Sequence, residues 1–175
     1  MPPRSPAWLL LALLLLGCNR KPPYEGKSVA ELERMLDDPS PTVQTQGAFG
    51  LGLHGAEARP AIPALVRTLK SPDTLVRQQA AIALGKIGTD AEETVPALIE
   101  ALRDPEWSIR RQAAVALGRI GPLARAAEPE LRRCQRDKNT LVRKAAAEAL
   151  GKIANKAASV SERVGLARRS VRAPG

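Results

Sequence analysis

The sequence predicts an all-α protein built as a solenoid, a stack of similar helical hairpins. Three observations predict this class. Aromatic residues make up only 2% of the 175 residues while hydrophobic residues make up 44%, so the apolar content is mostly Ala, Leu, Val and Ile, which suits closely packed helices. The sequence also repeats itself at a shift of 33 residues. Within each repeated unit, apolar residues recur at helical spacing.

The repeated unit is clearest in residues 75–88, 108–121 and 141–154. These segments share the pattern Val/Ile-Arg-x-x-Ala-Ala-x-Ala-Leu-Gly-x-Ile, and a divergent copy at 42–55 keeps the frame. A period of this length is typical of repeat architectures in which each unit buries its apolar face against its neighbours. We therefore expect four repeats, at residues 23–55, 56–88, 89–121 and 122–154, in a domain covering 27–154.

Each repeat is expected to hold two helices. Pro63, Pro96 and Pro129 recur at one position and are expected to open the first, shorter helix, because proline suits the first helical turn. In the first repeat, Ser28 and Glu31 form a capping box instead.

The second helix of each repeat is predicted from a single apolar stripe. Gly88 and Gly121 follow two of these helices where a left-handed stop belongs. Alanine in the stripe lets neighbouring helices approach closely. In the second repeat the stripe consists of Val76, Ala80, Ala83, Leu84 and Ile87.

The repeated pattern, with Asp-Pro or Pro-Asp before it, resembles HEAT-like repeats, notably the short kind of the phycobilisome lyases. The resemblance implies a right-handed α-solenoid of about four 33-residue two-helix repeats, with the second helices lining its concave face. It also implies that a recurring arginine bonds the aspartate preceding its helix. A ligand-binding ladder is the alternative use of these residues, which are Asp38, Arg77, Asp104, Arg110, Asp137 and Arg143. Gln44 and Ser71 interrupt this Asp-Arg ladder.

The N-terminus is expected to be an export signal. Arg4 precedes ten consecutive apolar residues, 7–16, which is half of the roughly 20 needed to span a bilayer. Leu15-Leu16-Gly17-Cys18 resembles the bacterial lipobox, which implies a signal peptide over 1–17 and a lipid on Cys18. An ordinary secretory signal is the alternative.

The resemblance to lipoproteins implies a location as well. Residues 18–26 would be a tether between lipid and fold, and Asn19 favours the outer membrane, facing the periplasm, over the inner membrane. The expected partners are therefore the membrane, through the lipid anchor, and an unidentified protein. The sequence does not indicate whether the protein is a monomer or an oligomer.

Charge is distributed unevenly over the repeats. The formal charges are −3, +3, −2 and +4 for the four repeats and +4 for residues 155–175. A basic C-terminal end suggests an acidic partner, with binding of a polyanion or anionic lipid as the alternative. Nucleic-acid binding is not expected, because interleaved aromatic residues are missing from the sequence. Residues 155–175 could cap the last repeat, lie on a membrane or be disordered.

Several residues are candidates for partner binding because they recur without an evident structural need. Lys86, Arg119 and Lys152 recur in a last helical turn, where a cation also complements the helix dipole. Trp107 stands where other repeats have small residues, as a contact or as a packing plug. The remaining candidates form a row on the second helices: Gln78, Gln79, Arg111, Gln112 and Lys144.

The expected function is a non-catalytic scaffold or adaptor for protein interactions. The chain has one histidine, no nucleophile paired with a base and no glycine-rich phosphate loop. No metal or cofactor is expected. Cys134 aligns with Met35, Thr68 and Ala101, which suggests a half-buried filler. A lyase-like accessory subunit is the remote alternative.

Overall fold

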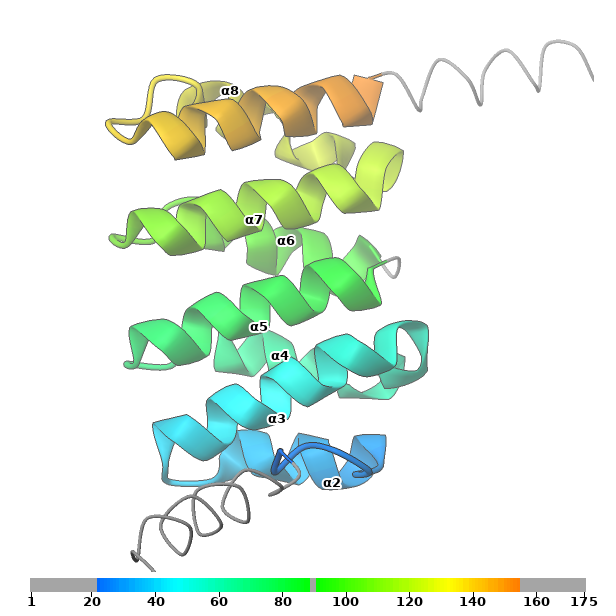
Figure 1. Ribbon diagram of the computed structural model, residues 1–175. Helices are drawn as coiled ribbons and strands as arrows, with labels where there is room; N and C mark the ends of the chain where they lie inside the picture. Colours follow the sequence, from blue (N-terminus) through cyan, green and yellow to red (C-terminus); the bar gives the residue numbers. More distant parts are fainter. Residues whose placement is uncertain (1–21, 89–90, 155–175) are drawn as a thin grey trace, which may run out of the picture.

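The computed structural model describes residues 22–88 and 91–154, and all regular secondary structure in these ranges is helical. Figure 1 shows successive hairpins stacked in one direction, from the first repeat at one end to the fourth at the other. The α-solenoid is therefore confirmed. The elements are α2 (Val29–Arg34), η1 (Met35–Asp37), α3 (Pro41–His54), η2 (Gly55–Ala61), α4 (Ile62–Thr68), α5 (Thr74–Ile87), α6 (Ala91–Ala101), α7 (Trp107–Ile120), η3 (Gly121–Ala127), α8 (Glu128–Cys134) and a last helix over 140–154, where η marks a 3-10 helix.

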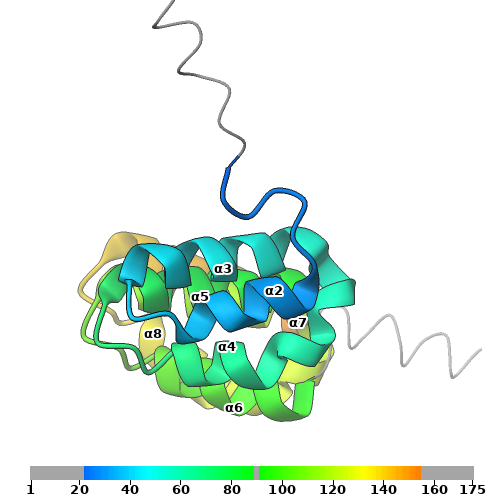
Figure 2. The same cartoon turned by 90° about the horizontal axis from the view of Figure 1, so that it is seen from below.

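The helices form two layers (Figure 2). The second helices of the repeats make one layer, in which α3 contacts α5 and α5 contacts α7, and the first helices make the other, in which α4 contacts α6. The apolar stripe predicted for α5 is buried along its whole length. Each first helix contributes one fully buried leucine to the core: Leu32, Leu65, Leu98 and Leu131.

The predicted starts of the first helices are confirmed in three repeats and wrong in one. Ser28 and Glu31 form the capping box, and Pro63 and Pro129 lie in the first turn of α4 and α8. Pro96 instead lies inside α6, which begins five residues earlier at Ala91. The side chains of Thr94 and Val95 are buried ahead of this proline, so packing keeps the preceding turn helical.

The predicted glycine stops differ in detail. Gly88 has φ 80° and ψ −25°, the left-handed conformation expected after α5. Gly121 has a positive φ of 76° but ψ of −134°, so it lies outside the left-handed helical region. The difference follows from the next element, because the chain passes at Gly121 directly into η3.

The chain meets the first repeat earlier than the sequence indicated. Residues 22–25 form a turn closed by the Glu25 N–H and the Pro22 carbonyl, 2.9 Å apart. The Tyr24 ring lies 4.9 Å from the Phe49 ring of α3, centroid to centroid. The C-terminal part of the predicted tether therefore contacts the fold.

Several predictions fall on residues 1–21, 89–90 and 155–175, outside the described ranges. They include the signal peptide, the lipid on Cys18 and the alternatives for the C-terminal tail. Within the described ranges, no helix has the length and apolar character required to cross a membrane.

Candidate functional site

The Asp-Arg ladder joins neighbouring repeats, which corrects the expected pairing within a repeat. Arg77 donates two hydrogen bonds to Asp104, with nitrogen–oxygen distances of 2.9 and 3.3 Å. Arg110 donates two to Asp137, at 2.7 and 2.9 Å. Each arginine extends forward to the next repeat with Nε and Nη2, while its Nη1 donates to carbonyl oxygens in the loop of its own repeat.

Pairing across the junctions explains the two interruptions together. Gln44 stands in the arginine position of the first repeat and Ser71 in the aspartate position of the second, so both belong to one junction. The Gln44 amide still donates to the Asp38 carbonyl at 2.7 Å, which retains the part of the pattern within the repeat. Because the paired side chains are only 10–17% exposed, the ladder holds repeats together and offers little surface to a ligand.

The residues of the predicted row on the second helices differ in whether their side chains make hydrogen bonds within the chain. Gln78 accepts a hydrogen bond from the Ser108 hydroxyl at 3.2 Å, and so links two repeats. Gln79 and Gln112 are half-buried. Arg111 is half-buried and Lys144 exposed, and within the described ranges neither makes a hydrogen bond or ion pair through its side chain. Binding by this row stays a prediction.

The three cations of the last helical turns are exposed. Lys86 has an intramolecular contact, because its Nζ lies 5.4 Å from the centroid of the Phe49 ring in the preceding repeat. Arg119 and Lys152 follow it in the next two repeats. Their positions fit the interaction with the helix dipole, and a role in partner binding stays a prediction.

Trp107 belongs to an exposed apolar row at the edge where the second helices begin. Its side chain is 40% exposed, so it is not a buried packing plug. Leu75 and Leu141 are the second residues of the neighbouring second helices and are 65% and 48% exposed. We call these three residues the apolar row. Exposed large apolar side chains in successive repeats are a feature of interaction surfaces.

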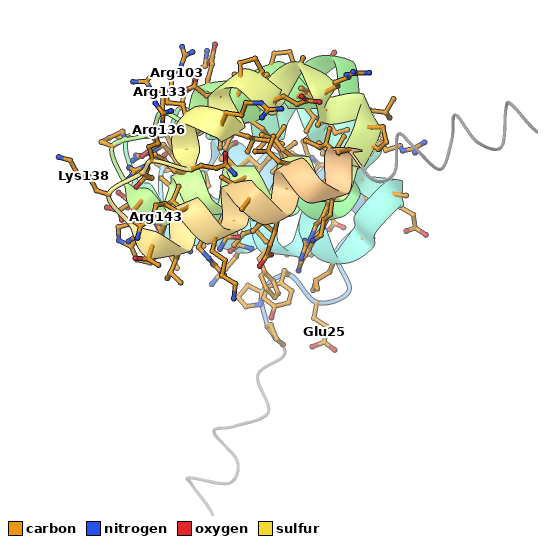
Figure 3. The ribbon with its side chains drawn as sticks, turned by 90° about the horizontal axis from the view of Figure 1, so that it is seen from above. Glu25, Arg103, Arg133, Arg136, Lys138 and Arg143 are labelled. Carbon is orange, nitrogen blue, oxygen red and sulfur yellow. The ribbon has the colours of Figure 1, made fainter. Side chains whose placement is uncertain are left out.

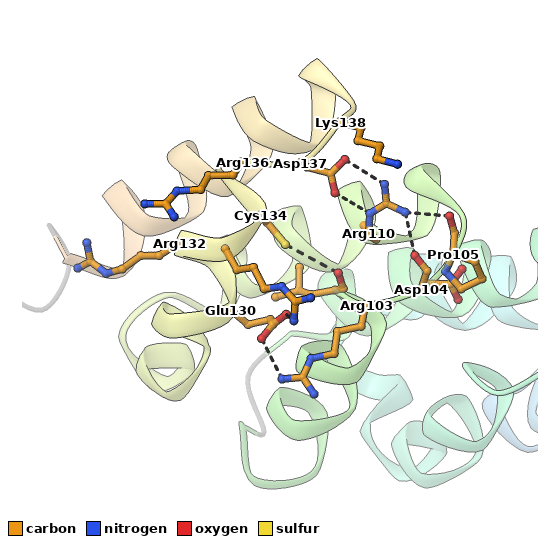
Figure 4. Close-up of a pocket in the computed structure, with 12 residues that line it drawn as sticks. Arg103, Asp104, Pro105, Arg110, Glu130, Arg132, Cys134, Arg136, Asp137 and Lys138 are labelled. Atoms are coloured by element: carbon orange, nitrogen blue, oxygen red, sulfur yellow. Dashed lines mark hydrogen bonds and ion pairs between the residues drawn. The ribbon is translucent and has the colours of Figure 1, made fainter.

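A basic pocket lies at the same edge, between the loop after α6 and the loop after α8 (Figure 4). Its volume is about 830 Å³, within the range of ligand and peptide pockets. Six basic and three acidic side chains line it, a formal charge of +3. We call it the turn-edge pocket, and its charged residues are Arg103, Asp104, Arg110, Glu130, Arg132, Arg133, Arg136, Asp137 and Lys138.

Most of the excess positive charge of the pocket is accessible. Glu130 serves two arginines, Arg103 at 2.9 Å and Arg133 at 3.4 Å, and the hydrogen bond from Arg103 lowers the pKa of this carboxyl. Arg136 and Lys138 are exposed and have no ion pair in the described part of the chain. Figure 3 shows the labelled cations gathered at one edge of the molecule. An acidic group entering here would meet several unneutralised charges.

Cys134 forms part of the pocket wall without being reactive. The residue is 5% exposed, and its Sγ lies 3.8 Å from the Leu102 carbonyl oxygen. Burial raises the pKa of the thiol to about 11, so it is protonated near neutral pH. Cys134 packs as a filler, as expected, but it is buried where the sequence suggested a half-buried position. Among the described residues, no group of His, Cys, Asp and Glu side chains could hold a metal ion.

Sequence reasoning missed the turn-edge pocket because its residues come from two repeats. Counting charge by repeat placed Arg103 and Arg110 in an acidic repeat and the other four cations in a basic one. One available signal was the cation that recurs as Lys70, Arg103 and Arg136. A second signal was the Arg132-Arg133 pair near it.

Comparison with known proteins agrees with this architecture. Residues 29–115 and 95–164 match the family model of HEAT repeats. The chain belongs to the HEAT-repeat family. No match was found among curated proteins.

Several solved structures share the HEAT-repeat fold of this chain. Human deoxyhypusine hydroxylase in complex with glycerol has a TM-score of 0.63 and 26% identity, over 83% of this chain and 54% of its own. The CpcE and CpcF complex of phycocyanin lyase from Nostoc sp. PCC7120 has a TM-score of 0.61 and 24% sequence identity, and the match covers 77% of this chain and 57% of that one. A designed armadillo repeat protein in complex with the peptide (KR)4 has a TM-score of 0.61 and 20% sequence identity, and the match covers 71% of this chain and 64% of that one. The chain thus spans less than two thirds of each.

Proposed function

We propose that this HEAT-repeat chain is a non-catalytic scaffold that holds an acidic segment of a partner protein at the surface of a membrane. The turn-edge pocket supports this proposal most directly, because its six basic and three acidic side chains leave a formal charge of +3. Arg136 and Lys138 supply exposed charge to it, and a carboxylate can take two parallel hydrogen bonds from a guanidinium such as that of Arg136.

The apolar row supports a peptide segment over a small anion. Trp107 and Leu141 lie in the first turn of their helices, at the edge that carries the pocket, so a segment lying along this edge meets both apolar and basic side chains. Charged contacts steer the encounter and fix the register, while burial of large apolar side chains supplies most of the affinity. The expected ligand therefore combines acidic and large apolar residues.

Catalysis is not part of the proposal, although the hydroxylase and the lyase among the similar structures are enzymes. The Cys134 thiol is buried and protonated. His54 is engaged by its own chain, with Nε2 3.0 Å from the Lys27 carbonyl oxygen and Nδ1 3.5 Å from the Glu57 carboxylate. These groups are poorly placed to act as a nucleophile or a base.

Site-specific crosslinking in cells tests where the partner binds. A photo-reactive residue at position 138 should capture a partner, whereas the same residue at position 57, in the second repeat, should not. The combined Arg132→Glu and Lys138→Glu changes should abolish capture at a nearby position, because they reverse the charge of the pocket. Arg111→Glu with Lys144→Glu makes an equal charge change on the row of the second helices, which is the competing site predicted from the sequence, and the pocket assignment requires that this pair leave capture intact. Loss with the second pair alone would contradict the assignment.

Attachment through Cys18 is the second part of the proposal and rests on the sequence of residues 7–18. Two or more acyl chains hold a protein stably at a membrane, whereas one is marginal. Cys18→Ala should move the chain from the membrane fraction to the soluble fraction and remove labelling by radioactive palmitate. Membrane retention of this variant would contradict the lipid anchor.

A further inference from the structure

Three rows of contacts join the second, third and fourth repeats, and two of these rows have the same form at both junctions. In the second-helix layer, a glycine lies against an alanine of the following repeat. A Cβ on Gly85 would lie 2.7 Å from the Ala116 Cβ, and one on Gly118 would lie 3.2 Å from the Ala149 Cβ. The second row is the Asp-Arg ladder, in which Arg77 and Arg110 each pair with the aspartate 27 positions later. The third row is ionic but keeps no single register: Arg103 pairs with Glu130, 27 positions later at 2.9 Å, whereas Lys70 pairs with Glu100, 30 positions later at 3.7 Å between exposed side chains.

Among the residues that the structure describes, all three rows end at the fourth repeat without a partner. Gly151 continues the glycine row, and a Cβ there would meet nothing within 4 Å. Arg143 continues the ladder but donates only to oxygens of its own repeat, and within the described ranges it has no carboxylate partner. Arg136 continues the third row and has no ion pair within the same ranges. The outer face of the fourth repeat therefore has the contacts of a junction without the following repeat.

The sequence after residue 154 does not supply the missing groups in register. Arg110 pairs with the residue 27 positions later, and the same step from Arg143 leads to Ser170. Arg103 also pairs 27 positions later, and that step from Arg136 leads to Arg163, another cation. Neither in-register position therefore holds a carboxylate.

The first repeat carries both carboxylates at the corresponding positions. Asp38 occupies the place of Asp137, and Glu31 the place of Glu130, three repeats earlier. The Asp38 carboxylate accepts one hydrogen bond, from the Ser40 N–H at 2.8 Å, and no arginine pairs with it in the described part of the chain. Repeats one and four also have opposite formal charges, −3 and +4.

We propose that the outer face of the fourth repeat binds the first repeat of a second copy of this chain, head to tail. Arg143 of one copy pairs with Asp38 of the next, and Arg136 pairs with Glu31, which continues both ionic rows across the interface. The contact uses different surfaces on the two copies, so it can extend beyond a dimer. Because its main contacts are ionic and near the surface, association weakens as salt rises.

Tyr24 limits the strength of this contact. Gly50 holds the position that Ala83, Ala116 and Ala149 hold in later repeats, where each meets the glycine of the preceding repeat. A Cβ on Gly50 would lie 2.6 Å from Leu32 Cδ2 of its own repeat and 3.0 Å from Tyr24 Cβ, which belongs to the segment before α2. Gly151 of a second copy can reach its full contact only when Tyr24 moves aside. Tyr24→Ala should therefore strengthen association.

Sedimentation equilibrium of the chain without residues 1–17, in a Cys18→Ala background, tests the proposal. We expect reversible association at low salt that tightens with Tyr24→Ala by about tenfold or more in Kd. Asp38→Arg alone and Arg143→Asp alone should each weaken it, and an equimolar mixture of these two variants should restore it, because each then presents the charge that the other needs. Glu57→Arg, which makes the same charge change at an exposed site of the second repeat, is the matched control.

Two results would overturn the proposal. One is a monomer for both the chain and its Tyr24→Ala variant at millimolar concentration. The other is association that neither the two charge reversals nor their mixture affects. If Arg143→Asp fails to fold by circular dichroism, Arg136→Glu replaces it, because that side chain is exposed and makes no ion pair within the described residues. It should weaken association in the same way, and association unchanged by Arg136→Glu would also overturn the proposal.

Discussion

The Arg110 guanidinium donates two hydrogen bonds to the Asp137 carboxylate across the junction of the third and fourth repeats, at 2.7 and 2.9 Å. The third contact of this guanidinium, from Nη1 to the Asp104 carbonyl at 2.8 Å, holds the loop of its own repeat. One side chain thus fixes a loop and joins two repeats. Such contacts between neighbours are what make a solenoid unfold cooperatively.

Loss of this pair should destabilise the fold. Asp137→Asn leaves the Arg110 charge in a site where the side chain is 17% exposed without its counter-ion. We expect the free energy of unfolding, measured by urea denaturation, to fall by about 1–3 kcal/mol. Arg125→Gln is the control, since Arg125 is 80% exposed and its ion pair is long at 3.7 Å. Equal stability of Asp137→Asn and the parent would contradict a structural role for the ladder.

The carboxylates of the junction should make stability depend on acid pH. The hydrogen bond from Arg110 lowers the pKa of Asp137, and that from Arg103 lowers the pKa of Glu130. Groups with lowered pKa values stabilise the fold fully above their ordinary values of 3.8 and 4.5. This contribution is lost as pH falls through the folded pKa values. Urea titrations should show a steep decline below about pH 4.5, shallower in Asp137→Asn. Parallel curves for the two proteins would contradict the assigned pairing.

Alanine substitutions at Gly85 and Gly151 should change the thermal stability in opposite directions. A Cβ on Gly85 would lie 2.9 Å from the Ala116 Cα, so Gly85→Ala forces two helices apart and should lower the Tm. Gly151→Ala meets no neighbour within 4 Å and replaces a poor helix former, so it should stabilise by up to about 1 kcal/mol. Thermal unfolding followed by circular dichroism measures both. Equal shifts would show that the glycine row is not a close contact.

The Cys134 thiol should react slowly in the folded protein. Burial raises its pKa to about 11, so both access and the thiolate fraction are low at neutral pH. In a Cys18→Ala background, Ellman's reagent should label this thiol in urea and label it much more slowly without urea. Fast labelling of the native chain would show that the pocket wall opens.

Much of the fold was predictable from the sequence because repetition supplies the same evidence several times. The buried stripe of α5 and the leucines of the first helices follow directly from the period. The start of α6 was not predictable, because the burial of Thr94 and Val95 overrides the proline signal. The direction of the Asp-Arg pairs was missed because a period locates residues within a repeat and leaves open whether they pair within it or across a junction.

The candidate site was less predictable than the fold. The exposure of Trp107 and the turn-edge pocket both arise where residues of different repeats meet. Arg103 and Lys138 are far apart in the sequence and share a pocket only because of the stacking. The interruptions at Gln44 and Ser71 gave a usable signal, since residues lost together at one junction indicate pairing across it.

Fluorescence anisotropy of a labelled peptide rich in Glu and Leu tests the proposed scaffold most directly. The chain should bind the peptide with a Kd that rises about tenfold or more from low to physiological salt. Arg132→Glu with Lys138→Glu should abolish binding, and Arg111→Glu with Lys144→Glu should not. A peptide with Gln in place of Glu and vesicles of anionic lipid should bind weakly. Equal binding of the Gln peptide, or unchanged binding by the Arg132→Glu and Lys138→Glu variant, would contradict the proposed site.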